Sequence, residues 1–223
     1  ASTTSMPLLT LPNTVWRWRK GTTPMGAIET MLLAVGYAQL GRHLGLPTHG
    51  YLCVSDAKSI DYQAGLESGM GAILGALAGI NVISGAGMLD FLLTQSLEKL
   101  LLDHEACGMA LRAARGIAAD AGESVALIAE VARLGEFLSH EHTRKHWKRE
   151  LSLPSRLIDR SSYGDWEAKG RQRAEGRAAA ELTRRLAAPA PPPLPEPTAR
   201  AVEQVMAAEA RRFGAASLPA PRE

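Results

Sequence analysis

Residues 49–87 decide the fold, and their sequence is HGYLCVSDAKSIDYQAGLESGMGAILGALAGINVISGAG. His49–Val54 is a short apolar run of the kind that forms a buried strand. Asp61–Ala78 has the length and spacing of a helix, and Gly79 is a residue at which helices commonly end. Ile80–Ser84 predicts a second buried strand. Strand, helix and strand in this order predict a parallel pair with a right-handed crossover, which is typical of the α/β class.

Helices are expected on both sides of this unit. Met25–Leu44 has apolar residues at helical spacing before it, and Thr94–Ile117 predicts a long helix after it. Three charge-rich helices are expected to follow, over 123–134, 141–151 and 164–186. We therefore divide the chain into an irregular start (1–24), a main domain (25–186), a linker rich in Pro and Ala (187–198), and a terminal helix and tail (199–223).

The composition excludes several classes of protein. The chain has 223 residues, of which 46% are hydrophobic and 22% charged, so it can bury a core and global disorder is not expected. Its 25 Lys and Arg residues are balanced by 23 Asp and Glu residues, so the net charge of +2 gives no reason to expect a nucleic-acid partner. Two cysteines cannot form a disulfide framework, which favours a reducing compartment and a cytoplasmic protein.

One stretch raises the question of a membrane span. Gly69–Leu89 contains no charged residue and is long enough to cross a bilayer. Within it, Gly71, Gly75 and Gly79 recur every four residues, which is the spacing of a close contact between helices. A buried helix followed by a buried parallel strand has the same hydropathy, and Asn81 interrupts the run. We expect the second arrangement and no membrane partner.

Polar side chains follow both expected strands. In parallel α/β folds, ligands bind beyond the carboxyl ends of the strands. A pocket of carboxylates, amides and a thiol suits a cationic organic substrate, because carboxylates attract its charge. For Asp56 and Asp61, capping of the following helix is the alternative. The residues that we predict to bind substrate are Asp56, Asp61, Gln63, Glu67, Ser84, Gly85 and Glu98.

Cys53 lies at the end of the first expected strand. A thiol there could act as a nucleophile or as a methyl acceptor if its surroundings lowered its pKa. Free cysteines are also among the residues most often buried in cores, so packing is the alternative. We name Cys53 as the candidate catalytic residue and expect it to line the pocket rather than to act as the nucleophile. Cys107, in the middle of a helix, is expected to pack.

Three histidines, His140, His142 and His146, lie close together in the sequence. The last two are four residues apart, a spacing that can place two imidazoles on one metal. The zincin pattern requires Glu directly after the first histidine of such a pair, and here Thr143 follows it. A third ligand is also missing from the pattern. We therefore predict a polar helix with a capping histidine, and no metal site.

Several spaced motifs can be compared with known families. They are Ser55–Lys58, Asp61–Glu67, Gly85–Leu89 and Ser96–Leu100, with Asp103 and Glu105 just beyond, then Phe137-Leu138, His142-Thr143, Asp159-Arg160 and Gly164–Trp166. In this order, and over about residues 20–186, they resemble the trimethylamine methyltransferase family. Several motifs in the right order make the resemblance far more specific than any one of them.

The resemblance implies a fold and a reaction. Members of that family fold as TIM barrels and move a methyl group from a methylated amine to the cobalt of a corrinoid on a separate protein. The implied partners are therefore a corrinoid protein and a small methylated amine. In the trimethylamine enzymes a pyrrolysine binds the amine, and alignment on Gly45–Pro47 and Ser55–Lys58 puts Cys53 at its position. The chain is thus similar to the branch without pyrrolysine, which acts on quaternary amines such as glycine betaine.

The expected barrel is incomplete. An eight-stranded barrel cannot close with the two or three strands visible here. We therefore expect the C-terminal portion of a TIM (β/α)8 barrel followed by additional helices, and a truncated chain, since it starts at Ala1 rather than at Met. A complementing N-terminal half or a second copy of the chain is the expected partner. The alternative function is a catalytically inactive half-barrel that acts only as a binding or assembly module.

Overall fold

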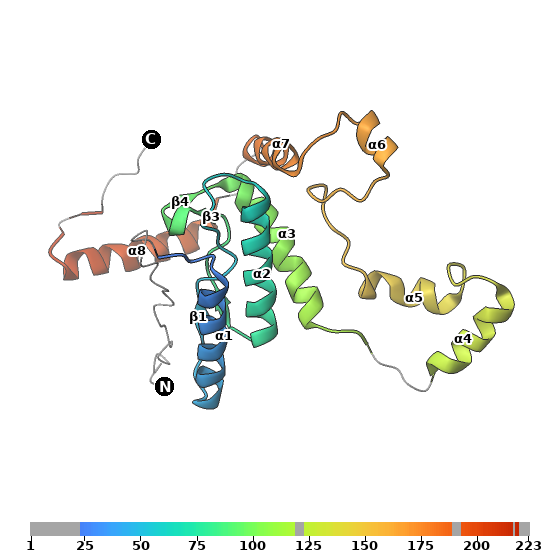
Figure 1. The fold of residues 1–223 in the computed structure, drawn as a ribbon. Helices are drawn as coiled ribbons and strands as arrows, with labels where there is room; N and C mark the ends of the chain where they lie inside the picture. The colour runs from blue at the N-terminus through green and yellow to red at the C-terminus, as the bar shows by residue number, and fades with distance from the viewer. Residues whose placement is uncertain (1–22, 119–122, 189–192, 216, 219–223) are drawn as a thin grey trace. The chain divides into compact units, whose positions relative to one another are not determined.

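The computed structural model describes residues 23–118, 123–188, 193–215 and 217–218 (Figure 1). Most of the expected irregular start therefore lies outside the described residues. The chain divides between Leu186 and Ala187 into two compact units. The described residues of the second unit form one helix, α8 (Glu196–Arg212), which begins three residues before the expected Ala199.

The predicted strand–helix–strand unit is present, with shorter strands than expected. β1 (His49–Gly50) pairs in parallel with β2 (Val82–Ile83), and α2 (Tyr62–Ala78) connects them. Soon after β1 the chain leaves the extended conformation, because Cys53 has a left-handed φ of 59°. The predicted parallel pairing is thus confirmed, and the mostly helical structure with few short strands is compatible with the α/β class, whereas the predicted strand lengths are wrong.

Helix α2 packs closely on the chain that follows β1. A Cβ atom at Gly71 would lie 2.7 Å from the backbone nitrogen of Cys53, and one at Gly75 would lie 2.6 Å from Cδ1 of Ile83. Gly71 and Gly75 therefore allow α2 to approach the strand segments closely, and do not form the contact between helices that their spacing also allows. Gly79 ends α2 with a left-handed φ of 70°, as predicted.

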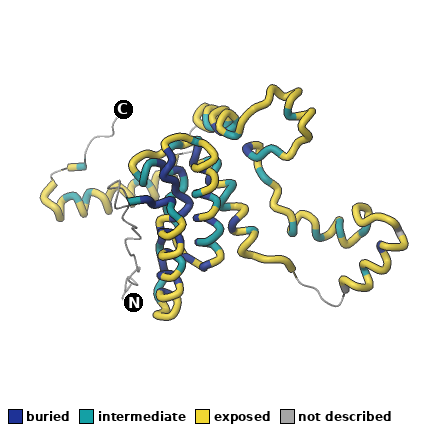
Figure 2. The backbone as a smooth tube through the Cα atoms, in the orientation of Figure 1, coloured by how far each residue is buried: buried dark blue, intermediate teal, exposed yellow. Residues whose placement is uncertain are grey.

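Two further helices complete the core. α1 (Ile28–His43) buries Met31, Ala34 and Ala38 against Leu52, Ala78 and Ile80. α3 (Leu97–Ala114) packs along α2, and Figure 2 places the buried residues where these three helices meet the strands.

A short hairpin precedes α3. β3 (Met88–Leu89) pairs antiparallel with β4 (Thr94–Gln95) around the 3₁₀ turn η1 (Asp90–Leu92). The helix was predicted to begin at Thr94, which is wrong. It begins after Ser96, whose hydroxyl accepts a hydrogen bond from the backbone N–H of Lys99 at 3.1 Å and so caps the helix.

Four helices follow α3 in the described ranges of the first unit. They are α4 (Glu123–Leu134), α5 (Glu141–Glu150), α6 (Tyr163–Ala168) and α7 (Ala174–Leu186). The single helix predicted over 164–186 is wrong, because Gly170 and Arg171 both have left-handed φ values, 85° and 53°, and separate α6 from α7. Most of this region is exposed (Figure 2).

Neither a barrel nor a membrane span is present in the described ranges. The strands there form two sheets of two strands each. No helix there combines the length and the apolar character that crossing a bilayer requires. The uncharged run Gly69–Leu89 is divided among the end of α2, the cap at Gly79, and β2 and β3, which agrees with the second of the two interpretations weighed above.

Candidate functional site

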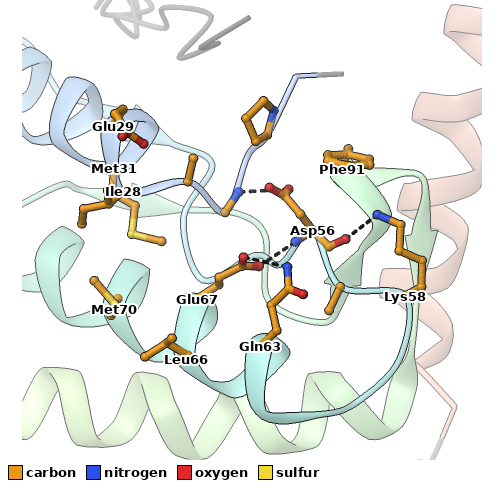
Figure 3. Close-up of a pocket in the computed structure, with 14 residues that line it drawn as sticks. Ile28, Glu29, Met31, Asp56, Lys58, Gln63, Leu66, Glu67, Met70 and Phe91 are labelled. Atoms are coloured by element: carbon orange, nitrogen blue, oxygen red, sulfur yellow. Dashed lines mark hydrogen bonds between the residues drawn. The ribbon is translucent and has the colours of Figure 1, made fainter. Parts of the chain in front are cut away.

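A cleft of about 780 Å³ opens between α1, the segment after β1 and the first turns of α2 (Figure 3). Its polar residues come mainly from the first predicted strand end. Three of the predicted substrate-binding residues, Asp56, Gln63 and Glu67, line it. Its other lining residues are Pro24, Gly26, Ala27, Ile28, Glu29, Met31, Ala57, Lys58, Leu66, Met70 and Phe91.

Glu67 is held firmly at the base of the cleft. Its Oε2 accepts hydrogen bonds from the Ser55 hydroxyl at 2.6 Å and from the backbone N–H of Asp56 at 2.8 Å. Its Oε1 accepts one from the amide of Gln63 at 2.9 Å, because residues four apart share a face of α2. None of these donors carries a charge, so the carboxylate is positioned without being neutralised.

Asp56 lies beside Glu67 and is 8% exposed. Its Oδ1 accepts hydrogen bonds from the backbone N–H groups of Met25 at 2.9 Å and Gly26 at 3.0 Å. Burial raises the pKa of Asp56 above its ordinary value and the charge of Glu67 acts in the same direction, whereas the two N–H groups and the charge of Lys58 lower it. Asp56 therefore ties down the chain before α1 and does not cap α2, which was the alternative for this residue.

Gly26 permits the close approach of these groups. A Cβ atom at this position would lie 2.5 Å from Oε2 of Glu67 and 3.2 Å from the backbone nitrogen of Asp56. Any side chain here would therefore displace a carboxylate that three hydrogen bonds hold in place. The sequence pattern gave no reason to single out Gly26, because the need for glycine arises from a contact with residues far along the chain.

Phe91 forms one wall of the cleft from an unusual turn. Asp90, Phe91 and Leu92 have φ values of 49°, 57° and 72°, three successive left-handed residues that are not glycine. Such conformations are strained and often occur at functional sites. The Lys58 ammonium lies 4.0 Å from the centre of the Phe91 ring and 3.2 Å from Asp90 Oδ1. The sequence analysis missed Phe91, and no motif or periodicity would have found it.

The cleft carries an excess of negative charge beside apolar surface. Three of its lining residues are acidic, Glu29, Asp56 and Glu67, and one is basic, Lys58. The Lys58 ammonium donates a hydrogen bond to the backbone oxygen of Asp56 at 2.6 Å, and its ion pair is with Asp90. Within the described part of the chain, no ammonium or guanidinium pairs with the carboxylate of Asp56 or Glu67. This combination suits a small cation that also carries apolar groups.

Four other predicted residues are not among those that line this cleft. Asp61 accepts a hydrogen bond from the backbone N–H of Ala64 at 3.0 Å and caps α2, which was the alternative for this residue. Glu98 accepts one from the Ser96 hydroxyl at 2.8 Å, and this bond contributes to a lowered pKa of Glu98. The Ser84 hydroxyl lies 2.5 Å from Nε2 of His49, and a Cβ atom at Gly85 would lie 2.4 Å from the backbone oxygen of Leu52.

Cys53 faces the core and is absent from the described lining of the cleft. Its side chain is fully buried, and its Sγ lies 3.7 Å from Sγ of Cys107 on α3. The hydrogen bond between the two thiols and burial both raise the pKa of Cys53. A neutral, buried thiol is a poor nucleophile.

A second buried charged group stands near the second strand end. The Lys99 side chain is 2% exposed, and its ammonium lies 2.5 Å from Oδ2 of Asp103 and 2.7 Å from the Ser68 hydroxyl. Asp103 also accepts a hydrogen bond from the backbone N–H of Gly87 at 2.7 Å. This group is charge-balanced and fixes the turn before β3.

The histidines form a helix start. Nδ1 of His140 accepts a hydrogen bond from the backbone N–H of His142 at 3.1 Å and caps α5, as predicted. The rings of His142 and His146 lie 4.5 Å apart. Among the described residues, no group of three or more His, Cys, Asp or Glu side chains is placed to hold a metal ion.

Comparison with known proteins agrees with the resemblance found in the sequence. Residues 13–214 match the model of the trimethylamine methyltransferase family. Glycine betaine methyltransferase of Desulfitobacterium hafniense (strain Y51) is 38% identical over 178 residues, which are 79% of this chain and 37% of that protein. Trimethylamine methyltransferase of Methanosarcina thermophila is 39% identical over 160 residues, or 70% of this chain and 32% of that protein.

A third relative extends the match along the chain. Trimethylamine methyltransferase of Desulfitobacterium hafniense (strain DSM 10664 / DCB-2) is 32% identical over 204 residues, which are 91% of this chain and 41% of that protein. The chain thus spans about a third to two fifths of the length of these relatives. Since the family model matches nearly the whole chain, the chain belongs to the trimethylamine methyltransferase family.

Proposed function

We propose that the chain supplies part of an enzyme that moves a methyl group from a methylated amine, most simply a quaternary amine, to a corrinoid protein. In this proposal the cleft at Asp56 and Glu67 binds the amine. The observation that carries the proposal is a carboxylate pair, Asp56 buried and Glu67 half-buried, that forms no ion pair with a described cation and lies beside apolar side chains. The names of the relatives, glycine betaine methyltransferase and trimethylamine methyltransferase, support the class of reaction.

The chemistry of such a transfer explains why the cleft is acidic. The corrinoid of the partner protein would supply the electron pair for the new bond to the methyl carbon, and the C–N bond would break with its electrons left on nitrogen. A quaternary substrate is therefore a permanent cation at nitrogen, and the carboxylates of the cleft attract it.

The described residues divide the work in this proposal. Asp56 and Glu67 supply negative charge, and Gln63 orients Glu67 through the hydrogen bond at 2.9 Å. Leu66, Met70 and Phe91 offer apolar contact to N-methyl groups. Cys53 has no covalent role, because a quaternary amine is already activated; it helps to position the segment that carries Asp56.

The proposal includes a completed barrel. A TIM barrel needs eight strands, and the chain spans 32–41% of the length of its relatives. α1 exposes Leu32, Leu33 and Leu40 to about half of their full extent, 57%, 53% and 50%. A polypeptide with the remaining strands of the domain is the partner that we infer for this surface. The free thiols of this chain support a reducing compartment, and we propose the cytoplasm.

Methyl transfer to free cobalamin tests the proposal. The chain is incubated with Co(I) cobalamin and glycine betaine or trimethylamine, alone and together with the unmatched part of the Desulfitobacterium hafniense glycine betaine methyltransferase. Mass spectrometry then measures methylcobalamin. We expect transfer in at least one arm, and at least a tenfold loss in Asp56→Asn.

The matched control is Asp159→Asn, the same chemical change in the exposed segment between α5 and α6. It should transfer as fast as the unchanged chain. The proposal is overturned if neither amine gives methylcobalamin in either arm, or if Asp56→Asn is as active as Asp159→Asn.

A further inference from the structure

The two cysteines of the chain lie side by side although they are 54 residues apart in sequence. Cys53 belongs to the segment after β1, and Cys107 belongs to the middle of α3. Their sulfur atoms are 3.7 Å apart, which is within the range of a weak hydrogen bond between thiols. No metal-ligand cluster among the described residues includes them, and the function proposed above gives neither sulfur atom a chemical role.

The pair is asymmetric. Cys53 is fully buried, whereas Cys107 is partly exposed. The hydrogen bond between the two thiols lowers the pKa of Cys107 to about 7, against desolvation, which raises it. Cys107 therefore has both solvent access and thiolate character, the two properties that make a cysteine reactive, while Cys53 has neither.

We propose that Cys53 and Cys107 form a redox-active pair in which Cys107 reacts with a small peroxide and Cys53 then closes an intramolecular disulfide. In the first step the Cys107 thiolate attacks one oxygen of hydrogen peroxide, the O–O bond breaks, and hydroxide leaves. In the second step the Cys53 sulfur attacks the sulfur of the Cys107 sulfenic acid. The S–O bond breaks, and the hydroxyl leaves as water with the proton of the Cys53 thiol. Two electrons pass from the thiols to the peroxide.

The geometry sets the size of the movement. A disulfide bond is about 2.05 Å long, so the sulfur atoms must approach by about 1.7 Å. Cys53 has little room to move toward α2, since a Cβ atom at Gly71 would already lie 2.7 Å from its backbone nitrogen. Closure therefore pulls the segment after β1 and α3 toward each other.

The movement has a consequence that rests on the proposed function. Asp56 follows Cys53 by three residues, and its backbone N–H donates to Glu67 at 2.8 Å. A pull on Cys53 disturbs the positions of both carboxylates. We therefore expect oxidation to weaken amine binding at the cleft, reversibly, as reduction of the disulfide restores it.

Intact-mass measurement tests the pair without any activity readout. The chain is treated with hydrogen peroxide, and free thiols are then alkylated. We expect a monomer that has lost two hydrogens and takes up no alkylating agent, a peptide linking Cys53 to Cys107, and full reversal by dithiothreitol. Two free thiols after treatment, or a link between two chains, would overturn the proposal.

Single variants test the order of the steps. In Cys53→Ser, peroxide should leave Cys107 as a sulfenic acid that dimedone traps; in Cys107→Ser, Cys53 should stay a free thiol in the folded chain. Equal rates of oxidation in the two variants would contradict the assigned roles. If a variant does not fold, alkylation of the unchanged chain answers the same question, since Cys107 should be labelled at least tenfold faster than Cys53. Glycine betaine binding to the oxidised chain is a separate measurement, so its failure leaves the thiol result intact.

Discussion

Two acidic groups follow the two parallel strands, and their surroundings differ. Near the second strand end, the carboxylate of Asp103 lies 2.5 Å from the buried ammonium of Lys99. Near the first, Asp56 and Glu67 accept hydrogen bonds from described groups that are all uncharged. The charge of Asp103 is balanced by Lys99, and this group holds a turn. The charge of Asp56 and Glu67 is left for a ligand. The role of an acidic side chain in this fold therefore depends on whether its partner is charged, and the linear sequence does not show which partner it meets.

The largest expected effect is on the balanced group. Lys99→Met leaves Asp103 buried without its cation, and breaking a buried ion pair by removing one partner costs about 3–5 kcal/mol. Urea unfolding followed by circular dichroism measures this loss. The matched control is Lys58→Met, because the Lys58 side chain is 63% exposed and its pair with Asp90 should contribute about 0–1 kcal/mol. Similar losses in both variants would erase the distinction between the two lysines.

A smaller loss of unfolding free energy is expected from a substitution at the floor of the cleft. Gly26→Ala forces a methyl group against Glu67, and such overpacking costs about 1–3 kcal/mol. Gly36→Ala is the control within α1, since no atom lies within 4 Å of the added carbon, and Ala should raise the unfolding free energy there by about 0.5–1 kcal/mol. Thermal or urea unfolding of both variants decides the matter; a stable Gly26→Ala chain would mean that Glu67 is free to move.

Substitution of Asp56, unlike that of Lys99, should not lower the free energy of unfolding. Burial raises the pKa of Asp56, so the folded chain binds this proton more tightly than the unfolded chain. The resulting stability is fully present below the unfolded pKa of about 3.9 and is lost as the pH rises through the folded pKa. At pH 7 the ionised carboxylate is therefore a cost, and Asn keeps an oxygen that accepts from Met25 and Gly26.

We accordingly predict that Asp56→Asn is at least as stable as the unchanged chain at pH 7. Asp159→Asn should gain no stability, because hydrogen bonds from Ser161 lower the pKa of Asp159 and favour its carboxylate in the folded chain. Urea unfolding at pH 7 measures it. A loss above about 1 kcal/mol, the centre of the range for destabilising substitutions, would assign Asp56 a structural role like that of Asp103.

The smallest expected effect concerns the charges of the balanced group. Asp103 raises the pKa of Cys107 and Lys99 lowers it, while the hydrogen bond with Cys53 sets the value of about 7. Alkylation of Cys107 should therefore rise with pH through about 7. Iodoacetamide labelling between pH 5 and pH 9, followed by mass spectrometry, gives the profile. A midpoint at the ordinary thiol value would show that neither Cys53 nor Lys99 acts on it.

The sequence predicted the unit that positions the cleft but not its details. The parallel pairing, α2 and the cap at Gly79 depend on local patterns, and these predictions were confirmed. The first strand ends at Gly50, and three residues later Cys53 adopts a left-handed backbone that its side chain does not favour. Asp56, Gln63 and Glu67 were found from their place after a strand, whereas Gly26 and Phe91 join the cleft through contacts across the fold.

Other differences have similar causes. Lys99 and Asp103 are four residues apart, a spacing that is also typical of exposed ion pairs on a helix surface. Their burial arises from contact with α2, where the Lys99 ammonium donates a hydrogen bond to Ser68, and the sequence pattern does not show this contact. The break between α6 and α7 had a local signal in Gly170, but its charged surroundings favoured a continuous helix. Local pattern therefore predicted the elements, and long-range packing decided which of their side chains meet.

Calorimetric titration with glycine betaine at pH 7 tests the central claim most directly. The account predicts one binding site per chain, at least tenfold weaker binding to Asp56→Asn than to Asp159→Asn, and no binding of 3,3-dimethylbutanol, which has the same trimethyl shape without the charge. Equal affinity of the two variants, or binding of the neutral alcohol as tight as that of glycine betaine, would contradict it.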